Sequence, residues 1–205
     1  MSSRRVRQHV NPLRSDLLDI GVEPVRSPDG AAIEVELGSA EAHFLIGRAA
    51  EEPENFYVGV EIRDLIVDKA NRACRKAGHG RVLSVFANMS TDLQRLFAPS
   101  VVTRFFLNFP DPWWKPRQQK RRVADDDLVS SMMRVLSPHG EIHVATDIFA
   151  IALDAMAALE AESRLANLAG PWTFLKESLF SARSRRERQC EQAGDKIWRL
   201  AYRRR

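Results

Sequence analysis

The sequence predicts an α/β fold with a mostly parallel β-sheet, helices on both faces of the sheet and an antiparallel pair of strands at the C-terminal end. Short apolar runs alternate with segments whose apolar side chains recur at helical spacing, and this alternation is typical of a parallel sheet. The chain has 205 residues, of which 44% are apolar. That length suits one substantial core and is short for two, so we expect a single domain over residues 1–205.

Five short runs are rich in the β-branched, aliphatic and aromatic residues that strands favour. In chain order, the expected strands are residues 31–37, 56–61, 81–86, 101–108 and 141–145. Gly38 ends the first strand. Residues 137–140, Ser-Pro-His-Gly, form a turn by composition and precede the fifth strand.

The segments between the strands carry apolar side chains at helical spacing. The expected helices are residues 40–51, 62–77, 124–136 and 148–162. Phe44, Leu45 and Ala49 form the buried stripe of the first helix, and Gly78 closes the second. Beyond the last helix, apolar residues predict the antiparallel strand pair at Ile197, Trp198, Leu200 and Tyr202.

Basic residues gather in three segments of the chain. Residues 1–14 carry four Lys/Arg and no acid, residues 115–122 carry five and no acid, and residues 181–205 carry nine against three acids. Because the net charge of the whole chain is only +4, the remaining residues form an acidic body. This distribution suits a protein that holds a phosphate backbone, although basic termini can also be solvated tails.

Membrane and metal partners are not expected. The basic N-terminus is followed by no apolar signal-peptide core, and no run approaches 18 apolar residues, so we expect a soluble, cytoplasmic protein. Cys74 and Cys190 are far apart in the sequence and belong to no metal-ligand spacing, which predicts reduced thiols and no metal site.

Residues 108–122, Asn-Phe-Pro-Asp-Pro-Trp-Trp-Lys-Pro-Arg-Gln-Gln-Lys-Arg-Arg, are the most informative segment. Two prolines flank Asp111, and each restricts the backbone, so a stiff turn aims this carboxylate in one direction. Trp113 and Trp114 then offer one face for core packing and one for stacking. The cations that follow include Lys115, Lys120, Arg121 and Arg122. We interpret the segment as a functional carboxylate beside a polyanion-binding loop; the alternative is that Asp111 is only a turn residue.

Ligands of parallel sheets bind beyond the carboxyl ends of the strands. The residues expected at those ends are Glu36 with Gly38, Glu61, Asn88, Asp111 and Asp147. Glu61 ends the second strand about 20 residues after the first glycine, where an acid accepts hydrogen bonds from ribose hydroxyls. Alternatively, Glu61 is a solvated acid at a helix N-terminus.

The segment Phe109-Pro110-Asp111-Pro112-Trp113, with Lys115 and the triplet at 120–122, resembles the signature of the tRNA (guanine-N7)-methyltransferases. These class I enzymes transfer a methyl group from S-adenosylmethionine to a guanine in the variable loop of tRNA. The resemblance extends from His9 to Leu200 and implies a Rossmann-like methyltransferase fold, S-adenosylmethionine as cofactor and tRNA as partner.

The resemblance also implies roles for individual residues. Glu36 and Gly38 belong to the methyl-donor loop, Glu61 contacts the ribose, and Asn88 with Met89 lies at the adenine end. Asp111 lies where the guanine meets the sulfonium.

Two further motifs of the family would hold the substrate base. Ala145-Thr146-Asp147 matches its Ala-Thr-Asp, and Ser184-Arg185-Arg186-Glu187 loosely matches its Thr-Lys-Phe-Glu, with Arg186 in the aromatic position.

The sequence departs from the family pattern in the donor loop. The family has Gly-x-Gly-x-Gly, whereas this chain has Gly38-Ser39-Ala40-Glu41-Ala42. An alanine held at positive φ costs roughly 1 kcal/mol. In addition, Gln118 and Gln119 stand where the family has at least one histidine. These departures leave two alternatives: a non-catalytic or donor-impaired RNA-binding homologue, and a methyltransferase that accepts a different nucleic acid or small base.

Overall fold

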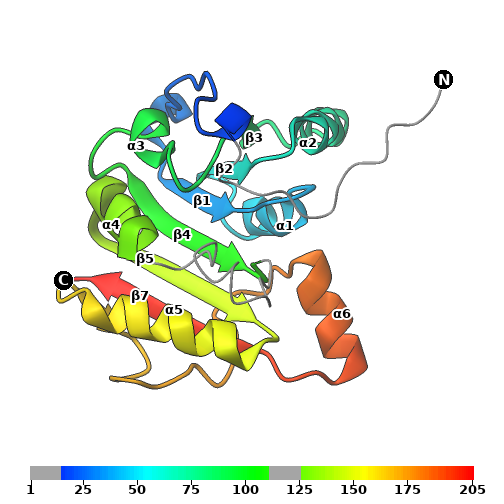
Figure 1. The fold of residues 1–205 in the computed structure, drawn as a ribbon. Helices are drawn as coiled ribbons and strands as arrows, with labels where there is room; N and C mark the ends of the chain where they lie inside the picture. The colour runs from blue at the N-terminus through cyan, green and yellow to red at the C-terminus, as the bar shows by residue number, and fades with distance from the viewer. Residues whose placement is uncertain (1–14, 111–125) are drawn as a thin grey trace.

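The computed structural model describes residues 15–110 and 126–205, and its described strands form one sheet in the order β3-β2-β1-β4-β5-β7-β6 (Figure 1). The strands are β1 Ile33–Leu37, β2 Phe56–Glu61, β3 Val82–Phe86, β4 Val102–Asn108, β5 Leu136–Thr146, β6 Leu165–Asn167 and β7 Trp198–Arg204. Strands β1 to β5 pair in parallel, whereas β7 is antiparallel to both β5 and β6. The predicted parallel sheet with an antiparallel C-terminal pair is therefore confirmed.

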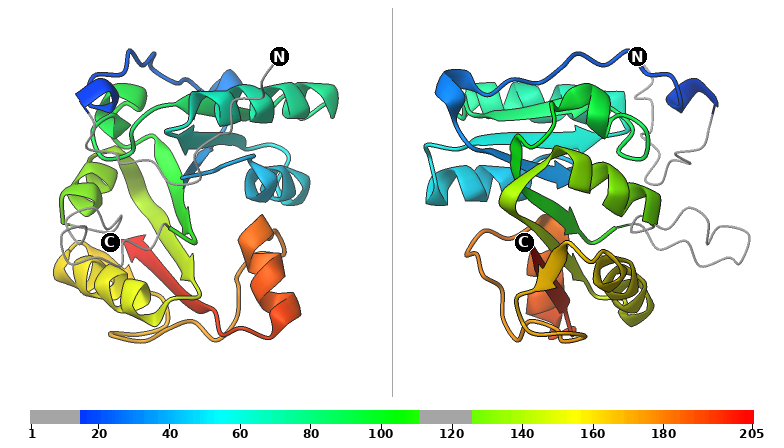
Figure 2. Two further views of the ribbon diagram at one scale, coloured as in Figure 1. Left: turned by 45° about the vertical axis from the view of Figure 1, so that its right-hand side comes forward. Right: turned by 90° about the vertical axis from the view of Figure 1, so that its left-hand side faces the viewer.

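Helices lie on both faces of this sheet, as predicted (Figures 1 and 2). They are α1 His43–Glu51, α2 Asp64–Lys76, α3 Leu93–Leu96, α4 Asp126–Val135, α5 Phe149–Ala161 and α6 Arg185–Ala193, with short 3₁₀ turns at Ser15–Leu17 and Pro28–Gly30. Helices α1 and α2 pack on one face and α3, α4 and α5 on the other, as the two clusters of buried side chains show. In the described part of the chain, no helix has both the length and the apolar character that crossing a membrane requires.

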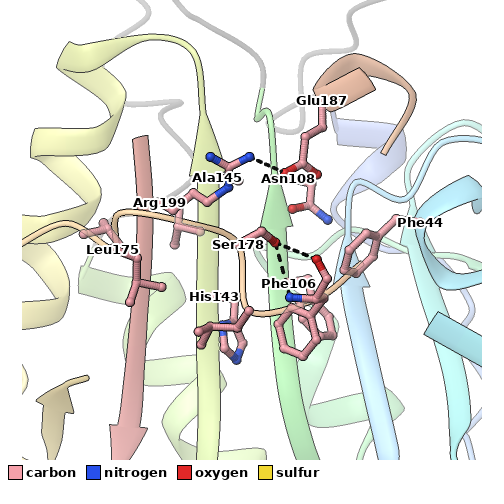
Figure 3. A pocket seen from close by; sticks show the side chains of 13 residues that line it. Phe44, Phe106, Asn108, His143, Ala145, Leu175, Ser178, Glu187 and Arg199 are labelled. Carbon is pink, nitrogen blue, oxygen red and sulfur yellow. Dashed lines mark hydrogen bonds and ion pairs between the residues drawn. The ribbon is translucent and has the colours of Figure 1, made fainter. Parts of the chain in front are cut away.

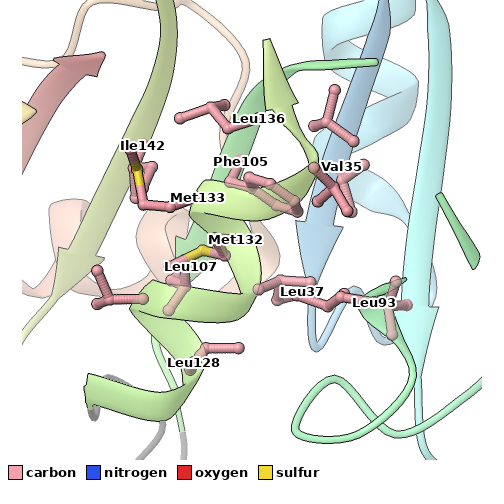
Figure 4. Close-up of a cluster of buried hydrophobic side chains, with 14 of the residues drawn as sticks. Val35, Leu37, Leu93, Phe105, Leu107, Leu128, Met132, Met133, Leu136 and Ile142 are labelled. Carbon is pink, nitrogen blue, oxygen red and sulfur yellow. The ribbon is translucent and has the colours of Figure 1, made fainter. Parts of the chain in front are cut away.

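The two faces of the sheet differ in chemistry because neighbouring side chains of a strand point to opposite sides. Val35 and Leu37 of β1 enter the apolar core with Phe105 of β4 and Met132 of α4 (Figure 4). A register slip of one residue would move this whole set to the opposite, more polar face of the sheet, so the core fixes the register. The opposite face carries buried polar side chains, among them Glu36.

A buried ion-pair network links α1 to the segment that precedes α6. Arg48 is 1% exposed, and its guanidinium donates to Glu34 of β1 through Nη2 (3.0 Å) and Nε (3.1 Å). The ring of Phe180 lies 4.4 Å from the Arg48 guanidinium carbon, and the backbone N–H of Ala182 donates to Glu51. The donor-loop helix and the C-terminal segment are therefore held in one arrangement.

Three expectations about the helices and strands need correction. Helix α1 begins at His43 rather than at residue 40, because Ala40 and Ala42 have φ values of 46° and 59°, which no α-helix contains. In its buried face, Arg48 takes the place expected for Ala49, which is only partly buried. Strand β5 starts at Leu136, before the predicted turn.

Residues 137–140, predicted as a turn, lie within β5, where they interrupt its regular pairing with β4. Leu136 pairs with Val102 and Glu141 with Arg104, so the register shifts between these pairs. His139 has a φ of 61°. The turn composition therefore marks a bulge within the strand rather than the loop that precedes it.

Two helices were not expected from the sequence. Helix α3 has only four residues, too few for a periodic pattern. Helix α6, Arg-Arg-Glu-Arg-Gln-Cys-Glu-Gln-Ala, has almost no apolar stripe. Its ends do carry signals: the Ser184 hydroxyl accepts the Glu187 N–H (3.1 Å) at the N-cap, and Gly194 has a φ of 74° at the C-cap.

Candidate functional site

The loop between β1 and α1 has a backbone that favours glycine at three positions. Gly38, Ala40 and Ala42 have φ values of 78°, 46° and 59°. The prediction that the two alanines occupy positions suited to glycine is therefore confirmed. The methyl group of Ala42 is fully buried, whereas Ala40 is exposed. The strain of Ala40 is partly offset by its N–H, which donates to Glu61 Oε2 (3.0 Å).

Glu61 closes β2 as a buried carboxylate, 2% exposed, and is not a solvated acid at a helix end. Besides the Ala40 N–H, it accepts the backbone N–H of Arg63 (3.0 Å). The Arg63 guanidinium also donates to both carboxylate oxygens, through Nε (2.8 Å) and Nη2 (2.7 Å). A ribose diol at Glu61 would replace part of this set. The sequence analysis did not identify Arg63 as the partner of Glu61, although its position two residues after this acid at the end of a strand indicates a possible ion pair.

Glu36 lies at the carboxyl end of β1 and is 3% exposed. Its Oε1 accepts from Asn108 Nδ2 (2.9 Å), and among the described residues its Oε2 has no hydrogen-bond partner. Burial raises the pKa of Glu36 to about 8; the Asn108 hydrogen bond opposes this rise, and the carboxylates of Glu61 and Glu187 add to it. The Oγ of Ser39 is likewise buried without a partner in the described part of the chain. An unpaired buried acceptor is costly, so this corner fits a ligand that brings positive charge and donors.

Asn88 follows β3 and is fully buried. Its amide donates to the Leu17 carbonyl (3.0 Å), and its Oδ1 accepts the Ser90 N–H (3.0 Å). The side chain therefore shapes the end of β3. Its neighbour Met89 lies beside the donor loop, with its terminal methyl 3.8 Å from where a Cβ on Gly38 would stand.

The substrate-side residues expected from the sequence meet at α6. Asp147 follows β5 and pairs with Arg186 Nη2 (2.5 Å). Glu187 is 3% exposed and accepts from Arg199 Nη2 of β7 (2.7 Å). Ser184 caps α6 and so fixes the first turn, from which Arg186 and Glu187 project.

A small, partly open hollow lies between β4, β5, β7 and the segment before α6 (Figure 3). Its polar lining includes Asn108, His143, Ser178, Glu187 and Arg199. Figure 3 shows Asn108 and the Glu187–Arg199 pair together at one end of it. The Nε of Arg199 is buried there without a partner among the described residues. Sequence reasoning assigned no role to Asn108 or Arg199, and the position of Asn108 as the last residue of β4 was the available signal.

The remaining expected residues lie outside the described part of the chain. They are Asp111, Trp113, Trp114, Lys115, Lys120, Arg121 and Arg122. The chain leads into them from the site itself: Asn108 bonds Glu36, and the Phe109 N–H donates to the Ala145 carbonyl (2.7 Å). Pro110, the last described residue before this segment, therefore follows a strand end that is bonded to Glu36.

Known proteins are similar to this chain in sequence and in fold. Residues 31–200 match a family described as putative methyltransferase. The tRNA (guanine-N(7)-)-methyltransferase of Synechococcus sp. (strain JA-3-3Ab) is 32% identical over 207 residues, which cover 98% of this chain and 86% of that protein. The protein of the same name from Microcystis aeruginosa (strain NIES-843 / IAM M-2473) is 30% identical and covers 99% of each chain.

Solved structures show the same fold at low sequence identity. A SAM dependent methyltransferase from Aquifex aeolicus has a TM-score of 0.58 at 9% identity, covering 90% of this chain and 85% of that one. Geranyl diphosphate C-methyltransferase from Streptomyces coelicolor A3(2) has a TM-score of 0.57 at 17% identity, covering 93% of this chain and 74% of that one. The predicted Rossmann-like methyltransferase fold is confirmed.

Proposed function

The chain belongs to the tRNA (guanine-N7)-methyltransferase family, and from this premise we propose that it transfers a methyl group from S-adenosylmethionine to N7 of a guanine in tRNA. The buried carboxylate of Glu36 carries the proposal for this chain. Its Oε2, which has no partner among the described residues, lies at the end of β1 beside the glycine-like loop at 38–42 and suits a ligand that carries positive charge. The relatives support an active enzyme over a donor-impaired homologue, because they are named methyltransferases and match nearly the whole chain.

Four residues form the donor side of the site. Bound S-adenosylmethionine supplies an electrophilic methyl group. Glu36 balances positive charge, Gly38 keeps the loop backbone close, and Glu61 accepts ribose hydroxyls in exchange for contacts with Arg63. Asn88 acts through the backbone that it shapes, since its own amide is already bonded.

Guanine N7 carries a lone pair and loses no proton on methylation, so the reaction needs alignment more than a strong base. Asp111 orients the guanine by accepting from its N–H edge and stabilises the positive charge that appears on the methylated ring. Asp147 and Glu187 hold the base from the side of β5 and α6. Ser184 positions Glu187 by capping the helix.

The tRNA backbone is held by cations outside the catalytic centre. Lys115, Lys120, Arg121 and Arg122 contact phosphates, and the basic segments 1–14 and 181–205 extend this surface. Because its substrate is tRNA, we place the enzyme in the cytoplasm.

Nucleoside mass spectrometry tests the proposed function. The protein is incubated with S-adenosylmethionine and an unmodified tRNA transcript, and the RNA is digested to nucleosides. We expect 7-methylguanosine in a donor-dependent reaction. If tRNA binds but no methylated nucleoside forms, the chain is an RNA-binding homologue rather than an enzyme.

A further inference from the structure

Among the described site residues, four carboxylates lie at the carboxyl edge of the sheet, and three of them are paired with arginines. Glu61 pairs with Arg63 (2.7 Å), Asp147 with Arg186 (2.5 Å) and Glu187 with Arg199 (2.7 Å). Glu36 differs, because its bonded partner among the described residues is the neutral amide of Asn108.

The described residues around Glu36 offer it little compensation for a negative charge. The neighbouring strand β2 presents Glu61, and α6 presents Glu187; both act on Glu36 as like charges.

Among the described residues, the other groups near Glu36 are already bonded to a partner or are polar without charge. Arg63 and Arg199, the cations closest to these carboxylates, are bonded to Glu61 and Glu187. On the donor loop, Ser39 is polar without charge, and the Glu41 carboxylate is held by Lys69 and His43. On β4, Asn108 is neutral.

Because Glu36 is buried, a negative charge on its Oε2 is unfavourable unless a proton or a cation neutralises it. The residue is 3% exposed, and Oε2 has no partner among the described residues. A protonated carboxyl is neutral and avoids the desolvation of a buried charge. A cationic ligand gives the ionised form the partner that the described residues do not provide.

We propose that Glu36 holds a proton in the donor-free protein and releases it to solvent when the positively charged methyl donor binds. This inference rests on the proposed function and adds regulation by pH to it. The O–H bond of the carboxyl breaks, the proton passes to the buffer, and the carboxylate then faces the ammonium or sulfonium group of the donor. No electrons are transferred.

The proposal predicts how donor affinity depends on pH. With a pKa of about 8, about nine in ten Glu36 side chains are protonated at pH 7. Each donor bound at pH 7 should then release about 0.9 proton, and the Glu36 contribution to affinity should rise about tenfold per pH unit up to about pH 8.

Calorimetry of the full chain with S-adenosylmethionine measures the released proton. Titrations at pH 7 in phosphate and in Tris give the proton number from the dependence of the heat on buffer ionisation. The donor's own amino group titrates near pH 8, so the comparison is with Glu36→Gln. We expect wild type to release about 0.9 proton more than this variant. The control Glu54→Gln, at an exposed acid, should match wild type.

Carbon NMR of the donor-free protein tests the proton on Glu36 even if Glu36→Gln binds no donor. With glutamate labelled at the side-chain carboxyl carbon, one resonance should titrate near pH 8 in wild type and in Glu54→Gln and be missing from Glu36→Gln. Donor binding at pH 7 should move this resonance to its ionised position. Donor binding with no shift, or a Glu36 resonance that titrates near pH 4.5, would overturn the proposal. Absence of any donor binding and of 7-methylguanosine would instead count against the proposed function.

Discussion

The two alanines of the donor loop respond differently to replacement by glycine. Ala40→Gly removes an exposed methyl from a residue at a φ of 46°. The left-handed conformation costs a non-glycine residue roughly 1–2 kcal/mol, and the added freedom of glycine in the unfolded chain costs roughly 0.4–1 kcal/mol. The free energy of unfolding should therefore rise by about 0.5–1 kcal/mol.

Ala42→Gly gains the same relief at a φ of 59° but loses a fully buried methyl group. Burial of one such group contributes about 0.8 kcal/mol, which cancels most of the gain. We expect a change near zero. The matched control is Ala50→Gly, at an exposed position of helix α1, where the same replacement should destabilise by about 0.5–1 kcal/mol.

Urea unfolding of the three variants measures these differences, and calorimetry follows donor affinity. Ala40→Gly should also tighten S-adenosylmethionine a few-fold, because it clears a methyl from the loop and relaxes the backbone next to the Glu61 contact. If Ala40→Gly destabilises the protein as Ala50→Gly does, the left-handed strain assigned to the loop is wrong. If S-adenosylmethionine does not bind to any form up to millimolar concentration, the proposed enzyme is wrong.

Three further predictions address the substrate, the tRNA surface and pH. Asp111→Asn should lower the rate of methyl transfer at least tenfold, about 1.4 kcal/mol of barrier, with the fold intact by circular dichroism; transfer at the wild-type rate would make Asp111 a turn residue. Replacing Lys120, Arg121 and Arg122 with alanine should make the slope of log affinity for tRNA against log salt concentration less steep, since each phosphate contact contributes about −0.7 to −0.9 to that slope. An unchanged slope would remove these cations from the interface. Burial raises the pKa of Glu36 in the folded protein from its ordinary value of 4.5 to about 8. The free energy of unfolding of the donor-free protein, relative to that of Glu36→Gln, should therefore fall as pH rises from 4.5 to 8, by up to about 1.4 kcal/mol per pH unit. Urea unfolding measures this difference, and equal pH profiles for the two proteins would contradict the raised pKa.

The strands were predictable because their signal is local. Each of the first five is an apolar run, and the edge to which they bring Glu36, Glu61 and Asp147 follows from parallel pairing alone. The glycine pattern of the loop indicated a positive φ for Ala40 and Ala42, whereas the helical spacing wrongly placed both residues in the first helix.

The partners of the site carboxylates could not be read from the sequence, because they depend on contacts between distant segments. Asn108 of β4 donates to Glu36 of the neighbouring strand β1, 72 residues away in the sequence, and Arg199 reaches Glu187 from the antiparallel β7. Arg48 replaced Ala49 on the buried face because Glu34 lies beneath it, a compensation that helical spacing does not reveal. Helix α6 lacks an apolar stripe, so in the sequence only its capping residues, Ser184 and Gly194, indicate a helix.

Methyl uptake by transcripts that lack N7 tests the central claim most directly. A tRNA transcript made with guanosine is compared with one made with 7-deazaguanosine, in which carbon replaces N7, using S-adenosylmethionine labelled in its methyl group. Transfer to N7 predicts that the first transcript gains label and the second gains none, while both bind the protein with similar affinity. Equal labelling of the two transcripts would show that methyl transfer occurs at another atom and would contradict the proposed function.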